Sequence, residues 1–161
     1  MNPSTSIVIF GASGDLSHRK LIPALFNLYR KGRLVEPFRV FGTAGRPWSD
    51  EDLHRIAREQ LDLIAHDPVD ESLWRTFAQN LTYQPGNVAD PQTYHQIAAS
   101  LADLEGGPAN RMYYLATPPE YFLEIITGLA NAGMLEENGG WRRVVIEKPF
   151  GSNHASARSL N

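Results

Sequence analysis

The sequence predicts an α/β fold in which helices cover both faces of a parallel sheet. Stretches of β-branched and aromatic residues alternate five times with segments of helical periodicity. The first stretch, Ser6 to Phe10, is nearly all apolar, as is typical of a strand buried on both faces. The chain has 161 residues with no internal repeat or linker, so one domain is expected. Right-handed crossovers between such strands give a parallel, doubly wound sheet.

Each element has a local signal. The predicted strands cover residues 6–10, 38–41, 81–84, 111–116 and 142–147. The predicted helices cover residues 15–31, 49–64, 71–79, 90–104 and 120–132, and another begins near residue 152. Ser49 is a good N-cap, and Gly32 lies where a C-terminal glycine cap is expected. Pro23 falls inside the first helix and is expected to kink or restart it.

Composition excludes several classes of function. The chain has no cysteine, which rules out disulfides, cysteine-ligated zinc and a thiol nucleophile. The net charge is −3 without a basic run, so we expect no nucleic-acid or membrane partner. The start of the chain lacks a signal-peptide pattern, and we expect a cytoplasmic protein. Histidines and carboxylates show no metal-ligand spacing, so no metal is expected.

The strongest local motif is the glycine turn Gly11–Leu16, which directly follows the first strand and opens the first helix. Glycine permits the tight turn, and the free N–H groups at the helix start attract a diphosphate. Ligands of Rossmann-like sheets bind at the carboxyl ends of the strands. The spacing Gly-x-x-Gly is looser than the dinucleotide fingerprint, so an ordinary tight turn remains an alternative.

The end of the second strand favours NADP over NAD. Folds that prefer NAD place an acidic residue there to bind the ribose 2′-hydroxyl. No acidic residue lies between Phe38 and Trp48, where the sequence instead has Thr43 and Arg46. An arginine can bind a 2′-phosphate with two donors, although a merely solvated arginine is the alternative.

Three motifs together resemble the glucose-6-phosphate dehydrogenase family. Residues Gly11–Pro23 contain its Gly-Asp-Leu, Arg-Lys and proline pattern. Residues 111–119 resemble its Tyr-Leu-Ala-x-Pro-Pro stretch, and residues 145–151 resemble its Glu-Lys-Pro-Phe-Gly signature. Their order and intervals fit along essentially the whole chain. The resemblance implies a Rossmann-like domain that binds NADP, with NAD also possible.

The resemblance also implies roles for single residues. Backbone amides of the glycine turn would hold the diphosphate, and Arg46 the 2′-phosphate. Lys20 and Lys148 would face glucose 6-phosphate, and Lys148 would also reach the nicotinamide. Taken alone, each lysine could simply be solvated. The expected cofactor contacts at the turn and the 2′-phosphate are Gly11, Ala12, Ser13, Gly14, Asp15, Leu16 and Arg46. Asn87 and Val88 would line the adenosine side, and Tyr114, Ala116 and Lys148 would lie near the nicotinamide.

One departure concerns the 2′-phosphate arginine, which the family often places directly after Thr-Ala. Gly45 takes that position here, and Arg46 follows one residue later. The shift could leave Arg46 equally useful, or it could loosen the preference and admit NAD.

The family's catalytic base is expected to be missing. The resemblance implies a histidine in a His-Tyr-Leu-Gly-Lys stretch beyond the Lys-Pro signature, and the chain lacks that stretch. We expect exposed or packing roles for the histidines present, which are His18, His54, His66, His95 and His154. The chain is therefore predicted to have no catalytic residue, to bind nucleotide and to turn over nothing.

Residues 1–161 are thus predicted to be one dinucleotide-binding domain. A larger C-terminal α+β domain, which would bind substrate and form any homo-oligomer, is predicted to be absent. One alternative is a freestanding NAD(P)-binding regulatory module without catalysis. Another is a small complete NADP oxidoreductase, which the lack of a Tyr-x-x-x-Lys pair disfavours.

Overall fold

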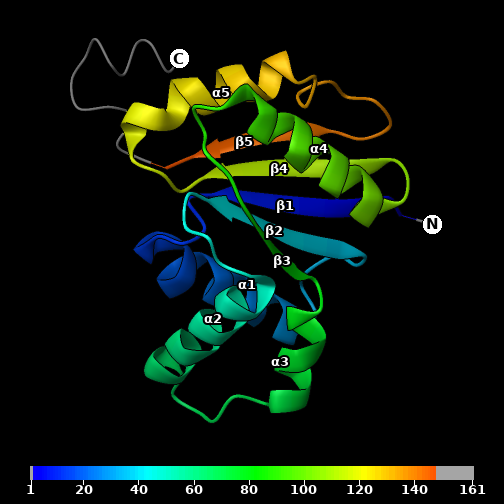
Figure 1. Ribbon diagram of the computed structural model, residues 1–161. Coiled ribbons are helices and arrows are strands. Elements are labelled where there is room, and N and C mark those ends of the chain that lie inside the picture. The colour runs from blue at the N-terminus through cyan, green and yellow to red at the C-terminus, as the bar shows by residue number, and fades with distance from the viewer. Residues whose placement is uncertain (1, 148–161) are drawn as a thin grey trace.

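A computed structural model describes residues 2–147 and contains a five-stranded, all-parallel sheet (Figure 1). The strands are β1 (Ser4–Phe10), β2 (Phe38–Ala44), β3 (Leu81–Pro85), β4 (Ala109–Leu115) and β5 (Arg142–Ile146). Their order across the sheet is β3-β2-β1-β4-β5, with each neighbouring pair parallel. This order confirms the predicted doubly wound α/β fold. The strand order reverses at β1, so the chain winds outward from the centre in both directions.

Helices cover both faces of this sheet. They are α1 (Ile22–Arg30), α2 (Asp50–Ile64), α3 (Glu71–Ala78), α4 (Pro91–Glu105) and α5 (Phe122–Asn131). The first three lie on one face, and α4 and α5 lie on the other (Figure 1). The capping signals act as expected: the Ser49 hydroxyl accepts from the Asp52 amide, and Gly32 ends α1 with φ of 66°.

The first predicted helix is interrupted before Pro23, as its sequence indicated. Residues Ser17–Leu21 form a π-helical turn, and α1 starts at Ile22. The Ile22 amide donates to the Ser17 carbonyl, five residues back. Pro23 has no N–H to continue an α-helical ladder, so the wider turn absorbs the break.

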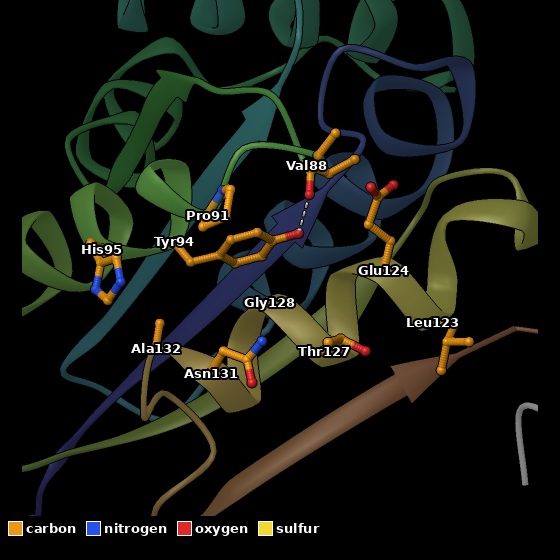
Figure 2. Close-up of a pocket in the computed structure, with 11 residues that line it drawn as sticks. Val88, Pro91, Tyr94, His95, Leu123, Glu124, Thr127, Gly128, Asn131 and Ala132 are labelled. Carbon is orange, nitrogen blue, oxygen red and sulfur yellow. Dashed lines mark hydrogen bonds between the residues drawn. The ribbon is translucent and has the colours of Figure 1, made fainter.

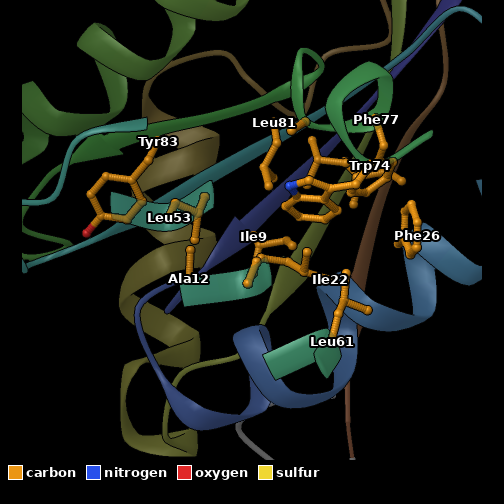
Figure 3. Packing of buried hydrophobic residues seen from close by; sticks show 14 of the residues in the cluster. Ile9, Ala12, Ile22, Phe26, Leu53, Leu61, Trp74, Phe77, Leu81 and Tyr83 are labelled. Atoms are coloured by element: carbon orange, nitrogen blue, oxygen red, sulfur yellow. The ribbon is translucent and has the colours of Figure 1, made fainter. Parts of the chain in front are cut away.

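Two buried clusters hold the layers together. The cluster under α1, α2 and α3 is rich in aromatic residues, and Figure 3 shows its packing around Ile9, Trp74 and Phe77. The Phe77 ring centroid lies 5.4 Å from that of Phe26 and 5.6 Å from that of Trp74. The cluster under α4 and α5 includes Tyr94 and Tyr113. Both clusters share the central strands, which explains the apolar sequence of β1.

The observed boundaries differ from prediction mainly at β2, which continues to Ala44 rather than ending at residue 41. A Cβ atom at Gly42 would lie 2.7 Å from the Ala12 Cβ. The glycine therefore leaves room for the turn after β1 to pack on β2. A short 3-10 turn, Pro119–Tyr121, also precedes α5. The helix predicted from residue 152 lies outside the described residues.

Candidate functional site

The glycine turn lies between the carboxyl ends of β2 and β4, where the strand order reverses. Gly11 has φ of 83°, a conformation that other residues rarely adopt. A Cβ atom there would lie 2.7 Å from the Ala116 carbonyl oxygen and 3.1 Å from the Thr117 Cγ2 atom. Glycine is therefore required both for the turn and for its close approach to the chain that follows β4.

Backbone hydrogen bonds fix the shape of this turn. The amides of Gly11 and Ala12 both donate to the Thr43 carbonyl, at 2.9 and 3.1 Å, and the Gly14 amide donates to the Gly11 carbonyl. Among the backbone bonds outside regular elements within residues 2–147, none has the Ser13 amide as donor, and Asp15 and Leu16 begin a helix, where the first amides have no acceptor within the helix. Unpaired amides at the start of a helix, aided by its dipole, form an anion-binding cup.

The predicted 2′-phosphate residue, Arg46, lies exposed on the loop after β2. Its guanidinium carbon is 5.8 Å from the centroid of the Trp48 ring. Across the described part of the chain, Arg46 makes no ion pair with a carboxylate. Its donors are therefore available to an anion. Thr43, the other polar residue here, is 1% exposed and faces the interior.

His18 adds a titratable group that sequence reasoning assigned only a packing or exposed role. Its side chain is 13% exposed, and its Nε2 atom lies 3.4 Å from the Asp15 carboxylate. Burial lowers the pKa of His18, and the positive charges of Arg19 and Arg46 add to that effect, while Asp15 opposes it. The charge of Arg46 therefore acts on His18 at the helix start.

The expected nicotinamide side is built from the ends of β4 and β5. The Tyr114 hydroxyl donates to the Glu147 carboxylate, and burial followed by this carboxylate raises the pKa of Tyr114. The Ala116 amide donates to the Phe10 carbonyl at 2.9 Å, which joins this side to the glycine turn. Lys148 directly follows Glu147 and lies outside the described residues.

Two predicted adenosine contacts lie in a different setting. The Asn87 Oδ1 atom accepts from the Ala89 amide at 2.9 Å, so this side chain caps its own loop. Val88 lines a pocket of about 370 Å³ between α4 and α5, where its carbonyl accepts from the Tyr94 hydroxyl (Figure 2). This pocket includes no residue of the glycine turn.

Lys20, the predicted substrate residue, lines a second groove of about 800 Å³ beside α1, the end of α2 and the start of α3. Arg19 and Arg30 share this groove, whereas no residue of the glycine turn does. The structure therefore brings the Gly11–Leu16 turn together with the ends of β2 and β4, and places Lys20 and Val88 in separate cavities.

Within residues 2–147, no group of three histidine or acidic residues could hold a metal ion. None of the helices in that range has the length and apolar character needed to cross a bilayer.

Comparisons with known proteins match this geometry to one family. Residues 8–161 match the model described as "Glucose-6-phosphate dehydrogenase, NAD binding domain". Glucose-6-phosphate 1-dehydrogenase of Bacillus subtilis is 41% identical over 99% of this chain and 32% of its own length. The crystal structure of the Mycobacterium avium enzyme has 33% identity and a TM-score of 0.84, over 98% of this chain and 33% of that one. A structure of glucose-6-phosphate dehydrogenase in complex with its substrate glucose-6-phosphate has 34% sequence identity to this chain and a TM-score of 0.83, over 97% of this chain and 32% of that one. The chain thus spans about a third of the length of these relatives.

Proposed function

Because the chain belongs to the family of glucose-6-phosphate dehydrogenase NAD-binding domains, we propose that it binds a nicotinamide adenine dinucleotide across the Gly11–Leu16 turn. The unpaired amides of this turn carry the proposal, since they point to an anion at the place where Rossmann-like sheets bind diphosphates. The wider set of contacts that we propose is the one predicted from sequence, including Asn87, Val88, Tyr114, Ala116 and Lys148.

The proposed cofactor is NADP rather than NAD. No acidic residue lies between Phe38 and Trp48 to accept the hydrogen bond of a ribose 2′-hydroxyl. Arg46 is exposed and, among the described residues, has no carboxylate partner, so its planar guanidinium can pair with a 2′-phosphate. Its position one residue after Gly45 is compatible with this role because its charge still acts on His18 at the helix start.

The activity proposed for the whole protein is oxidation of glucose 6-phosphate to 6-phosphogluconolactone, the reaction that enters the pentose phosphate pathway. When bound, the cofactor accepts a hydride from the sugar. The family's base lies beyond the Lys-Pro signature, so we propose that residues 1–161 form the cofactor domain and turn over nothing alone. A larger C-terminal α+β domain would supply the base, most substrate contacts and any dimer interface, with Lys20 and Lys148 helping to bind substrate. We propose a cytoplasmic location for this protein.

Calorimetric titration of the chain with NADP and NAD tests the binding proposal. We expect Arg46→Ala to weaken NADP binding by about 1.5–3 kcal/mol, the range for a charge-assisted contact, and to leave NAD binding nearly unchanged. Arg143→Ala is a matched control, because Arg143 also lies over a tryptophan, 4.6 Å from the Trp141 ring centroid, but on β5. Equal losses for both cofactors would remove Arg46 from this role.

A turnover assay tests the proposed division between the domains. The purified chain is mixed with glucose 6-phosphate and NADP, and NADPH formation is followed by absorbance. We expect no formation above the rate without protein. NADPH formed in proportion to the amount of chain would contradict the proposal that the base lies elsewhere.

A further inference from the structure

We propose that Trp48 and Tyr83 are positioning residues that hold Arg46 in place for a 2′-phosphate and so set the preference for NADP over NAD. This inference rests on the proposed function and deepens it, because it names the residues behind the cofactor selectivity. The sequence pattern alone predicts no role for either residue.

Tyr83 fixes the backbone of Arg46. The hydroxyl of Tyr83 lies 2.7 Å from the Arg46 carbonyl oxygen and 3.2 Å from the Ala44 carbonyl oxygen. The Trp48 amide also donates to the Arg46 carbonyl, at 2.9 Å. One carbonyl thus accepts from two sides, and the peptide that follows Arg46 cannot rotate without losing both bonds.

Both ends of this loop are anchored as well. At its start, the Gly86 amide donates to the Ala44 carbonyl at 2.9 Å. At its end, the Tyr83 amide donates to the carboxylate of Asp50, the first residue of α2. Tyr83 is only 5% exposed and belongs to the core under α1, α2 and α3 (Figure 3). The loop is therefore tied to the rigid part of the domain.

Trp48 positions the side chain of Arg46. The Trp48 ring packs against the Tyr83 ring, with their centroids 5.7 Å apart. The guanidinium carbon of Arg46 lies 5.8 Å from the centroid of the same Trp48 ring. A cation–π contact orients a guanidinium through its face and leaves the N–H donors at its edge free. A carboxylate partner would instead occupy those donors. The stack therefore prepares Arg46 for a phosphate at a low entropic cost.

The stack lies beside the glycine turn. Burial raises the pKa of Tyr83, while the neighbouring Ser13 hydroxyl and the charge of Arg46 oppose that increase. The charge of Arg46 also acts on His18 at the helix start. The Gly11 and Ala12 amides donate to the Thr43 carbonyl, which joins the turn to the end of β2, so a phosphate on the adjacent ribose would lie near the loop that carries Arg46.

Calorimetric titrations of the 161-residue chain with NADP and with NAD test this inference through the ratio of the two dissociation constants. We expect Trp48→Leu to weaken NADP binding about 2- to 5-fold, the value of an exposed cation–π contact, and to leave NAD unchanged. Trp48→Phe retains a ring and should recover most of the ratio. Tyr83→Phe removes only the hydroxyl and should lower the ratio about 2- to 10-fold.

A double-mutant cycle separates positioning from simple stability. If Trp48 acts through Arg46, then Trp48→Leu in the Arg46→Ala background should cause no further loss of NADP affinity. Unfolding in urea identifies any variant that is not folded. If Trp48→Leu does not fold, the ratio of dissociation constants for Trp48→Phe and Tyr83→Phe tests the inference instead. Equal weakening of both cofactors, or an unchanged ratio in all three variants, would overturn the inference. A wild-type chain that binds neither cofactor would instead refute the proposed function.

Discussion

Replacing Gly11 by alanine is predicted to damage both stability and cofactor binding, because two separate constraints meet at this residue. Its φ of 83° strains any residue that carries a Cβ atom. That Cβ atom would also lie 2.7 Å from the oxygen and 2.9 Å from the carbon of the Ala116 carbonyl. Both atoms belong to the backbone, so the conflict can be relieved only by separating the glycine turn from the end of β4.

Gly32 provides a matched control for the magnitude. It has φ of 66°, and a Cβ atom there would meet nothing within 4 Å. Gly32→Ala therefore carries only the conformational strain, roughly 1–2 kcal/mol. Gly11→Ala adds a steric conflict in a packed region, about 1–3 kcal/mol. We expect the free energy of unfolding to fall by about 2–5 kcal/mol for Gly11→Ala, and by 1–3 kcal/mol less for Gly32→Ala.

Urea unfolding of the chain and the two variants measures this difference, and titration with NADP measures its effect on the site. Moving the turn away from Ala116 changes the direction of its unpaired amides, so we expect at least about a tenfold loss of NADP affinity for Gly11→Ala. Gly32 caps α1 far along the chain from the turn, and its variant should keep wild-type affinity. Equal destabilisation by the two substitutions, or full NADP affinity in folded Gly11→Ala, would refute the reasoning.

Two further predictions concern the buried charges. The Glu105 side chain is 2% exposed and pairs with Arg111 at 2.7 Å, so Glu105→Gln should lower the free energy of unfolding, measured in urea, by about 3 kcal/mol. Asp62→Asn, at the exposed pair of Asp62 with Arg58, should lower it by less than about 1 kcal/mol. Similar losses for the two variants would contradict this prediction. The pKa of His18 is lowered in the folded state, so the unfolded chain binds its proton more readily, and stability should fall as pH drops through about 6.5. His18→Gln should reduce that slope in unfolding curves at pH 7.5 and 5.5, and an unchanged slope would assign the pH dependence to other groups.

Much of the fold could be predicted because its signals are local. The glycine after β1, the Ser49 cap and the Asp90-Pro91 helix start each act within a few residues, and the structure has an element boundary at each of them. The same holds for Pro23, whose missing amide alone predicts a break in the first helix. The predicted family is confirmed for a related reason, since its motifs are short segments of fixed spacing.

The contacts around Arg46 could not be predicted in this way. The Tyr83 hydroxyl bonds to a carbonyl 37 residues earlier in the chain. Sequence gives Tyr83 only the alternating pattern of a strand residue, and its contact depends on the register that pairs it with Gly42. For His18 the helical pattern predicts only a packing or exposed role, whereas its pKa depends on its burial in the fold and on the charges of Asp15 and Arg46. Only the pairing register of β2 with β3 places Tyr83 next to the loop that follows β2.

The strand order also bears on the proposed division between cofactor binding and chemistry on the substrate. Phe10 pairs with Thr43 on one side and with Leu115 on the other, so the glycine turn that follows it has the Arg46 loop on one flank and the β4 end on the other. In the proposed binding mode the 2′-phosphate lies over β2, and the nicotinamide lies toward Tyr114 and Glu147 at the opposite flank. Each winding step beyond β4 moves outward from the diphosphate. In the division that we propose, the base meets the sugar on the nicotinamide side, whereas the turn and the loop that face the diphosphate and the 2′-phosphate follow directly from the pairing of β1 with β2.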